Sequence, residues 1–154
     1  MSDSKKLLTL DSNVFVGSAK ADEKYRKNCI DLLKLVPDNF VLSEPSIVYQ
    51  EVCGTIARRV GSSEAKEFGE KLDKLVLPEL LYICDKSFCL ASYSLCSEYG
   101  IYAIDSLYLR VAIDSGAIIV SLDREDFIDK IKKNHHNVEA YHVSEFPYRL
   151  RSYL

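Results

Sequence analysis

The sequence predicts an α/β fold, a three-layer α/β/α sandwich around a mainly parallel sheet of four or five strands. Short apolar runs alternate with longer amphipathic stretches along the 154 residues, and strands that alternate with helices pair in parallel through crossover connections. The run at residues 117–120 is continuously apolar and β-branched, which is typical of a strand covered on both faces. The length indicates one domain, which we expect to span residues 1–154.

The first part of the chain predicts two strands and one helix. Residues 7–10 form a compact apolar run, which predicts a buried strand that enters a turn at residues 11–13. Apolar residues recur on one helical face between residues 25 and 36, and Pro37 ends that helix. Residues 40–42 predict a second short strand.

The middle of the chain predicts helices. A helix is expected over residues 43–61, because Pro45 suits a first turn and Gly61 suits an end. The next helix runs from residue 63 to the proline at position 78. A further apolar stripe lies between residues 88 and 99 and is closed by the glycine that follows.

The last part of the chain returns to alternating helices and strands. A helix is predicted over residues 105–114, with Gly116 as its C-terminal cap. The strand at residues 117–120 follows, then a short helix over residues 125–133. Residues 138–143 predict the last strand.

The composition bounds the class of protein. Hydrophobic residues make up 47% and charged residues 28%, as in an ordinary globular domain. No apolar run approaches the ~20 residues that a membrane helix needs, and residues 1–6 lack the apolar core of a signal peptide. We therefore expect a cytoplasmic protein without membrane contact. The five cysteines include no Cys-x-x-Cys pair, so neither a disulfide framework nor a zinc site is predicted.

Four acidic residues are expected to meet at one edge of the sheet. Asp11 and Asp123 each directly follow a predicted strand, where the loops of a parallel sheet form the binding crevice. Asp105 begins the helix that leads into the second of these strands, so it starts at the edge where that strand ends. Glu51 flanks the apolar stripe of its helix, where a charge is costly unless something compensates it.

Each acid also has a simpler interpretation. Asp105 could be a helix N-cap, and Asp123 could lie in a solvated turn. Asp11 could form an Asx-turn with the residues that follow it. Glu51 could pair with Arg58, which lies two turns later on the same helical face. The joint arrival of the four residues at one edge favours a shared site over these separate roles.

A cluster of carboxylates predicts a cation. At ~5 Å and an effective dielectric constant of ~20, each pair repels by about 3 kcal/mol. Such groups either take up protons or bind cations, and oxygen ligands without nearby His or Cys favour Mg²⁺ or Mn²⁺. A divalent ion held in this way can lower the pKa of a water and offset charge on a phosphate. The formal net charge of −3 also means that contact with nucleic acid must depend on metal ions or on a local basic patch. Together these points favour phosphodiester hydrolysis.

The sequence resembles the PIN-domain family, in particular the VapC toxin-like ribonucleases. Four stretches carry the resemblance in the family's order: LTLDSNVFV at residues 8–16, PSIVYQEV at 45–52, IDSLYLRVA at 104–112 and IIVSLDREDF at 118–127. The first and last stretches are fairly specific, and the two helical ones are not. The turn after Asp123 is one residue longer than the usual form, which leaves open whether Glu125 or Asp126 also reaches the metal.

The resemblance implies a PIN fold and a Mg²⁺- or Mn²⁺-dependent endoribonuclease acting on RNA. Asp11, Glu51, Asp105 and Asp123 would be the catalytic and metal-binding acids. Three residues would be polar supports: Asn13, Ser121 and Asp126. The resemblance also implies a homodimer and, for a VapC relative, an inhibitory antitoxin.

Other residues and functions remain open alternatives. Three arginines near the acids are candidate contacts for RNA phosphates, or simply solvated helix residues: Arg58, Arg59 and Arg110. A phosphatase of the haloacid dehalogenase type would need an acid where Asn13 stands. The alternatives to a toxin are a non-catalytic PIN-fold module that binds RNA or protein, and a housekeeping RNA-processing nuclease without an antitoxin.

Overall fold

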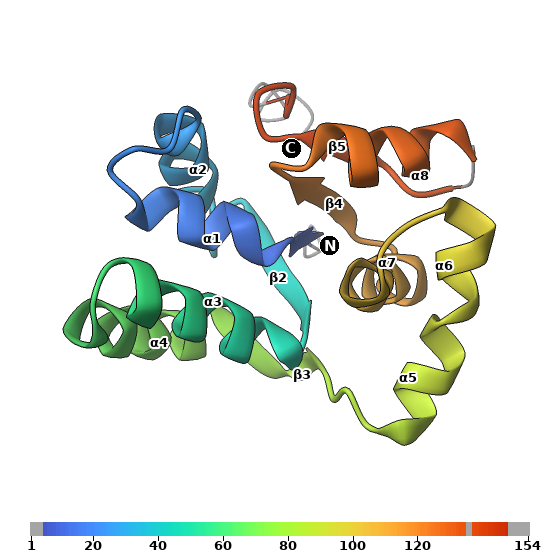
Figure 1. Ribbon diagram of the computed structural model, residues 1–154, viewed down its shortest axis with the longest axis horizontal. Helices are drawn as coiled ribbons and strands as arrows, with labels where there is room; N and C mark the ends of the chain where they lie inside the picture. The colour runs from blue at the N-terminus through green and yellow to red at the C-terminus, as the bar shows by residue number, and fades with distance from the viewer. Residues whose placement is uncertain (1–4, 135–136, 148–154) are drawn as a thin grey trace.

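A computed structural model describes residues 5–134 and 137–147 and contains one five-stranded sheet in the order β3-β2-β1-β4-β5 (Figure 1). Every neighbouring pair of strands runs parallel. The strands are β1 (Lys6–Leu10), β2 (Phe40–Pro45), β3 (Val76–Tyr82), β4 (Ile118–Ser121) and β5 (Ala140–His142). The predicted α/β sandwich with a parallel sheet is confirmed.

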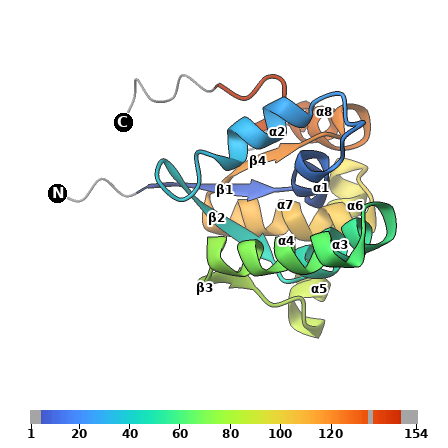
Figure 2. The ribbon, with the colours of Figure 1, turned by 90° about the vertical axis from the view of Figure 1, so that its left-hand side faces the viewer.

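Helices cover both faces of this sheet. They are α1 (Ser12–Ala19), α2 (Arg26–Leu33), α3 (Ile47–Arg59), α4 (Ser62–Leu75), α5 (Lys86–Ser92), α6 (Ser94–Tyr99), α7 (Ala103–Ser115) and α8 (Asp129–Lys133), with a π-helical turn η1 (Arg124–Ile128) before α8. Figures 1 and 2 show α1 to α4 on one side of the sheet and α5 to α8 on the other. This is the three-layer arrangement.

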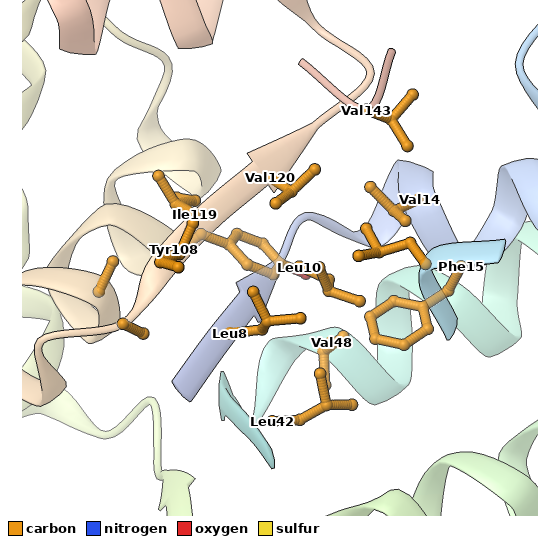
Figure 3. Packing of buried hydrophobic residues seen from close by; sticks show 14 of the residues in the cluster. Leu8, Leu10, Val14, Phe15, Leu42, Val48, Tyr108, Ile119, Val120 and Val143 are labelled. Atoms are coloured by element: carbon orange, nitrogen blue, oxygen red, sulfur yellow. The ribbon is translucent and has the colours of Figure 1, made fainter. Parts of the chain in front are cut away.

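The core lies on both faces of the two central strands. Leu8 and Leu10 of β1 are completely buried, and so are Ile119 and Val120 of β4. Neighbouring residues of a strand point to opposite faces, so the burial of both Ile119 and Val120 shows that the sheet is covered on each side. Figure 3 shows these side chains packing together with Phe15 from α1.

The strand order places a topological switch point between β1 and β4. The chain moves from β1 to β2 and β3 in one direction, and then crosses back over the sheet to β4 and β5. Strand order therefore reverses between β1 and β4, which are paired from Leu8 and Ile118 to Leu10 and Val120. In open parallel sheets, ligands bind outside the carboxyl ends of the strands at such a switch point.

Several predicted boundaries are wrong. Residues 12–19 form a helix rather than a turn alone, and residues 43–45 belong to β2 rather than to the helix that follows. β3 contains Pro78, which was expected to end a helix; a proline fits because β3 is an edge strand, where one N–H is not needed for the ladder. The stripe at residues 88–99 is two helices, α5 and α6.

Two further predictions concern the chain as a whole. No helix among the described residues has the length and apolarity to cross a membrane. All five cysteines are free thiols, and Cys29 is the buried one.

Candidate active site

Asp11 lies where β1 passes into α1 and is held from the β4 side. Its backbone N–H donates to the carbonyl of Val120 at 3.0 Å, which extends the β1–β4 ladder to the switch point. Its Oδ2 accepts hydrogen bonds from Ser121 Oγ at 2.7 Å and Asn13 Nδ2 at 3.2 Å. The side chain of Asp11 is thus fixed by two polar groups in a site where only 5% of the residue is exposed.

Asn13 and Ser121 also shape the turn after β4. Asn13 Oδ1 accepts from the Leu122 backbone N–H at 3.0 Å, and Ser121 Oγ accepts from the Asp123 backbone N–H at 2.9 Å. The Asp123 side chain in turn accepts from the Asp126 backbone N–H at 3.1 Å and so caps η1. One hydrogen-bond network therefore connects the two acids that follow β1 and β4.

Asp105 reaches the same edge from the helix that leads into β4. It lies in the first turn of α7, after the N-cap residue Tyr102, so the alternative that Asp105 is the N-cap is wrong. Burial and, after it, the charges of four other acids together raise the pKa of its carboxyl to about 7; these acids are Asp11, Asp123, Glu51 and Asp126. Charges that act on Asp105 in this way lie near it.

Glu51 projects from the second turn of α3, which packs on α1. Its Oε1 accepts a hydrogen bond from the Tyr108 hydroxyl at 2.7 Å. No ion pair joins Glu51 to Arg58 in the described part of the chain, so the pairing considered as an alternative is not formed. The Glu51 charge instead raises the pKa of Asp11 and of Asp105.

The electrostatics of the cluster favour uptake of positive charge. The pKa of Asp11 is raised to about 6, first by burial and then by the charges of Glu51 and Asp123, against the opposing effect of the hydrogen bond from Ser121. Two carboxyl groups with raised pKa values, each facing several others, indicate charges that lack a counter-ion. A divalent cation at this position would offset the repulsion.

The carboxylate ligands are of the kind that such an ion prefers, but their positions do not form a preassembled binding site. Within residues 5–134 and 137–147, no three His, Cys, Asp or Glu side chains are placed closely enough to chelate a metal as they stand. The acids whose charges act on Asp105 come from the end of β1, from α3 and from the turn after β4, and carboxylate ligands suit hard cations such as Mg²⁺ and Mn²⁺. These side chains would have to close around the ion by rotation.

The remaining predicted residues are placed less centrally. Asp126 is exposed, yet its charge reaches Asp105, whereas Glu125 is exposed on the same turn without such an effect among those given for Asp105. Arg58 and Arg59 are exposed in the last turn of α3. Arg110 contacts the neighbouring helix and its own: its Nη2 donates to the Ala91 carbonyl at 2.7 Å, and its Nη1 lies 3.5 Å from Asp114.

Two buried residues of the site were not found from the sequence. Glu44, at the end of β2, is completely buried; one carboxyl oxygen accepts the Leu10 backbone N–H at 2.7 Å and the other has no hydrogen-bond partner. Tyr108 is also completely buried. The charge of Asp11 contributes to the raised pKa of both Glu44 and Tyr108. The available signal was a glutamate beside an apolar strand and a tyrosine one turn after Asp105, and neither is specific alone.

A cavity with several apolar residues in its lining lies away from the four acids. About 430 Å³ of space opens between α1, α2 and α4, with Phe15, Leu33 and Phe68 in its lining, and none of the four acids lines it. Charged residues line it as well: Lys34, Glu64, Glu67 and Lys71.

Comparison with known proteins identifies the family. The fold resembles the VapC20 toxin of Mycobacterium tuberculosis, described as cleaving the sarcin-ricin loop (TM-score 0.64, 12% identity, 86% of this chain and 98% of that chain). It also resembles VapBC2 of Rickettsia felis bound to a DNA fragment from its promoter (0.62, 16%, 88% and 98%) and FitAcB of Neisseria gonorrhoeae (0.60, 17%, 91% and 99%). No curated protein matches the sequence. The family model of the PIN domain matches residues 8–134, more than half of the sequence, and the chain therefore belongs to the PIN domain family.

Proposed function

We propose that this chain is a Mg²⁺- or Mn²⁺-dependent endoribonuclease that hydrolyses RNA phosphodiester bonds. The observation that carries the proposal is the surroundings of Asp105. Three other acids, brought by β1, α3 and the turn after β4, raise the pKa of its carboxyl through their charges. A fold has little structural reason to gather four carboxylates at one edge of its sheet, because like charges destabilise each other.

Each residue has a stated role in this proposal. Asp11, Glu51, Asp105 and Asp123 would hold the ion, which would supply a water of lowered pKa and offset charge on the phosphate. Ser121 and Asn13 hold the Asp11 carboxylate in one orientation through their hydrogen bonds. Asp126 adds negative charge at the rim and tightens the turn that carries Asp123.

We further propose that the chain is the toxin of a VapBC-type pair, which forms a homodimer and is inhibited by an antitoxin protein. The support is the shared fold with VapC20, VapBC2 and FitAcB, and with a chain from a toxin–antitoxin complex of Klebsiella pneumoniae. Arg58 and Arg59 remain candidates for RNA contact, because both are exposed at the end of the helix that carries Glu51.

Substitution of single acids tests the nuclease. Asp11→Asn and Asp123→Asn should lower Mn²⁺-dependent cleavage of RNA at least about 100-fold, since even the residues that support metal ligands typically contribute 10- to 100-fold. Circular dichroism should show an intact fold for both. Asp22→Asn is the matched control, because the side chain of Asp22 is 86% exposed and Asp22 is not one of the proposed site residues.

The outcomes separate the candidate functions. Cleavage at the wild-type rate by either site variant would rule out this assignment. A non-catalytic binding module would show no Mn²⁺-dependent cleavage of any RNA by the wild-type protein. A toxin should arrest growth when it is expressed alone, and co-expression of a neighbouring antitoxin gene should relieve that arrest. A housekeeping nuclease should cause no growth arrest.

A further inference from the structure

Tyr108 is a polar residue in the middle of the apolar core. It lies on α7 one turn after Asp105, and none of its surface is exposed. Figure 3 shows its side chain among the packed residues, reaching from α7 toward Leu10 of β1. A phenylalanine would fill this position without the need to satisfy a hydroxyl group, so the hydroxyl requires an explanation.

Within the described part of the chain, the hydroxyl has one hydrogen-bond partner, and that partner belongs to the site. It donates to Glu51 Oε1 at 2.7 Å, a short distance typical of a bond from a hydroxyl to a carboxylate. Among the described residues, this is the hydrogen bond that the Glu51 carboxylate receives. The two residues are 57 positions apart, on helices that cover opposite faces of the sheet (Figures 1 and 2).

In this hydrogen bond the phenol is the donor and the carboxylate is the acceptor. Burial raises the pKa of Tyr108 above its ordinary value, and the charges of Asp11, Glu51 and Glu44 also raise it. A fixed donor aimed at a carboxylate sets the direction of that carboxylate.

Glu51 needs such a constraint more than the aspartates do. Its side chain has one more rotatable bond than aspartate, and fixing rotatable bonds costs entropy. Asp11 is fixed by Ser121 and Asn13, and Asp123 by the Asp126 backbone N–H. Tyr108 is the corresponding support for Glu51, and because it shares α7 with Asp105, it also ties the positions of these two acids together.

We propose that Tyr108 is a positioning residue that fixes the Glu51 carboxylate for cation binding, an inference that rests on the function proposed above. The hydroxyl occupies Oε1 and leaves the second carboxylate oxygen for the ion. This arrangement means that loss of the hydroxyl weakens metal binding through Glu51, and not through the packing of the ring.

The test is Tyr108→Phe, which keeps the buried ring and removes the hydroxyl. The Kd for Mn²⁺, measured by calorimetric titration, should rise about 10- to 100-fold, as is typical when the support of a metal ligand is lost. Tyr49→Phe is the matched control, because Tyr49 also donates to a carboxylate, Asp73 Oδ1 at 3.3 Å, at an exposed position between α3 and α4. That variant should leave the Kd unchanged within about twofold.

Two further measurements separate positioning from packing. In a Glu51→Gln background, Tyr108→Phe should add little to the loss of Mn²⁺ affinity, because both variants remove the same interaction. In protein labelled with ¹³C-glutamate, relaxation of the Glu51 side chain, assigned with Glu51→Gln, should show order in the wild type and its loss in Tyr108→Phe.

Each result decides one of the two proposals. If the wild type binds Mn²⁺ and Tyr108→Phe changes neither the Kd nor the order of Glu51, the positioning role is overturned while the nuclease proposal stands. If the wild type binds no Mn²⁺ but Glu51 still loses order in Tyr108→Phe, the nuclease proposal fails while Tyr108 still fixes Glu51. A Tyr108→Phe protein that loses only thermal stability assigns the hydroxyl a structural role.

Discussion

Glu44 lies beyond the point where the backbone pairing of β1 with β2 ends. The paired residues of these strands end at Leu8 and Leu42. Beyond that point side chains replace the ladder: the Thr9 hydroxyl donates to the Ser43 carbonyl at 2.8 Å, and Glu44 accepts the Leu10 N–H. Because Leu10 directly precedes Asp11, the Glu44 carboxyl supports the strand end from which Asp11 projects. Its complete burial raises its pKa well above the ordinary value.

Substitutions at Glu44 should separate its hydrogen bond from its charge. Glu44→Gln keeps an acceptor for the Leu10 N–H and should change the free energy of unfolding by less than about 1 kcal/mol at pH 7. Glu44→Leu leaves that N–H buried without a partner and should lower the free energy by about 1–3 kcal/mol more. Urea denaturation measures both, and equal stability of the two variants would show that the hydrogen bond contributes nothing.

The residues of the site differ in how far the sequence could reveal them. Asp11 and Asp123 follow strands, and strand ends are readable from apolar runs, so their meeting could be inferred before any coordinates. Glu44 and Tyr108 gain their meaning from partners 34 and 57 positions away. No local pattern encodes such a pairing, because it depends on how α7 packs over β1 and β2. The same limit explains Arg110, whose guanidinium is occupied by Ala91 and Asp114.

At the scale of the elements, α1 was missed because its burial leaves no amphipathic pattern. Five successive residues of this helix are buried: Val14, Phe15, Val16, Gly17 and Ser18. Helical periodicity is visible when one face is polar, and α1 packs against α2, α3 and the sheet at once. β3 was missed for the opposite reason: as an edge strand with exposed residues and Pro78, it lacks the continuous apolar run that revealed β4. α7 was predicted well, since its polar face and Gly116, at φ 73°, mark its course and end.

Two helical glycines should respond oppositely to alanine. A Cβ on Gly17 of α1 would lie 2.9 Å from Leu122 Cδ1 and 3.1 Å from Cys29 Sγ, whereas one on Gly54 of α3 would meet the Gln50 amide at an ordinary 3.6 Å. Gly54→Ala should therefore raise the free energy of unfolding by about 0.5–1 kcal/mol through helix propensity. Gly17→Ala should lower it by about 1 kcal/mol, because overpacking outweighs that gain.

Thermal or urea denaturation of the two variants compares the effect of the same Gly→Ala substitution at two helical positions. Gly17→Ala also displaces Leu122, whose backbone N–H is held by Asn13 beside Asp123. A stabilised Gly17→Ala protein would mean that the Leu122 side chain moves aside freely and that the contact between α1 and the turn after β4 is loose.

At the scale of the whole molecule, the topology gathers charge at one edge. Strand ends and the starts of returning helices meet there by necessity, so β1, β4 and α7 each bring an acid to this edge, and α3 brings Glu51. Apolar packing covers both faces of the central strands β1 and β4, whereas the edge strand β3 is partly exposed. At the carboxyl edge, mutual repulsion of the acids opposes folding until protons or cations neutralise it.

The repulsion among these carboxylates predicts how the stability of the protein depends on pH and on metal ions. The native pKa values of Asp11 and Asp105, about 6 and about 7, lie above the ordinary value of 3.8. Between these limits the native state binds more protons than the unfolded state, so the stability that these groups contribute is full below pH ~4 and is lost as the pH rises to ~7. For fully buried Asp11 the loss is at most about 3 kcal/mol, and for half-buried Asp105, partly screened by water, about 1–2 kcal/mol.

Asp105→Asn should remove part of this pH dependence. In metal-free buffer at pH 7.5 the variant should be more stable than the wild type by about 1 kcal/mol, and at pH 4 the two should agree. The lowered pKa of His142 acts in the opposite direction, adding stability as the pH rises toward 6.5, but it is common to both proteins and cancels in their difference. Millimolar Mn²⁺ should raise the Tm of the wild type at pH 7.5 and much less at pH 5, because protons then occupy the carboxylates that the ion needs. Differential scanning calorimetry measures all of these stabilities, and an Asp105→Asn protein that is less stable than the wild type at pH 7.5 without metal would show that Asp105 stabilises the fold instead of opposing it.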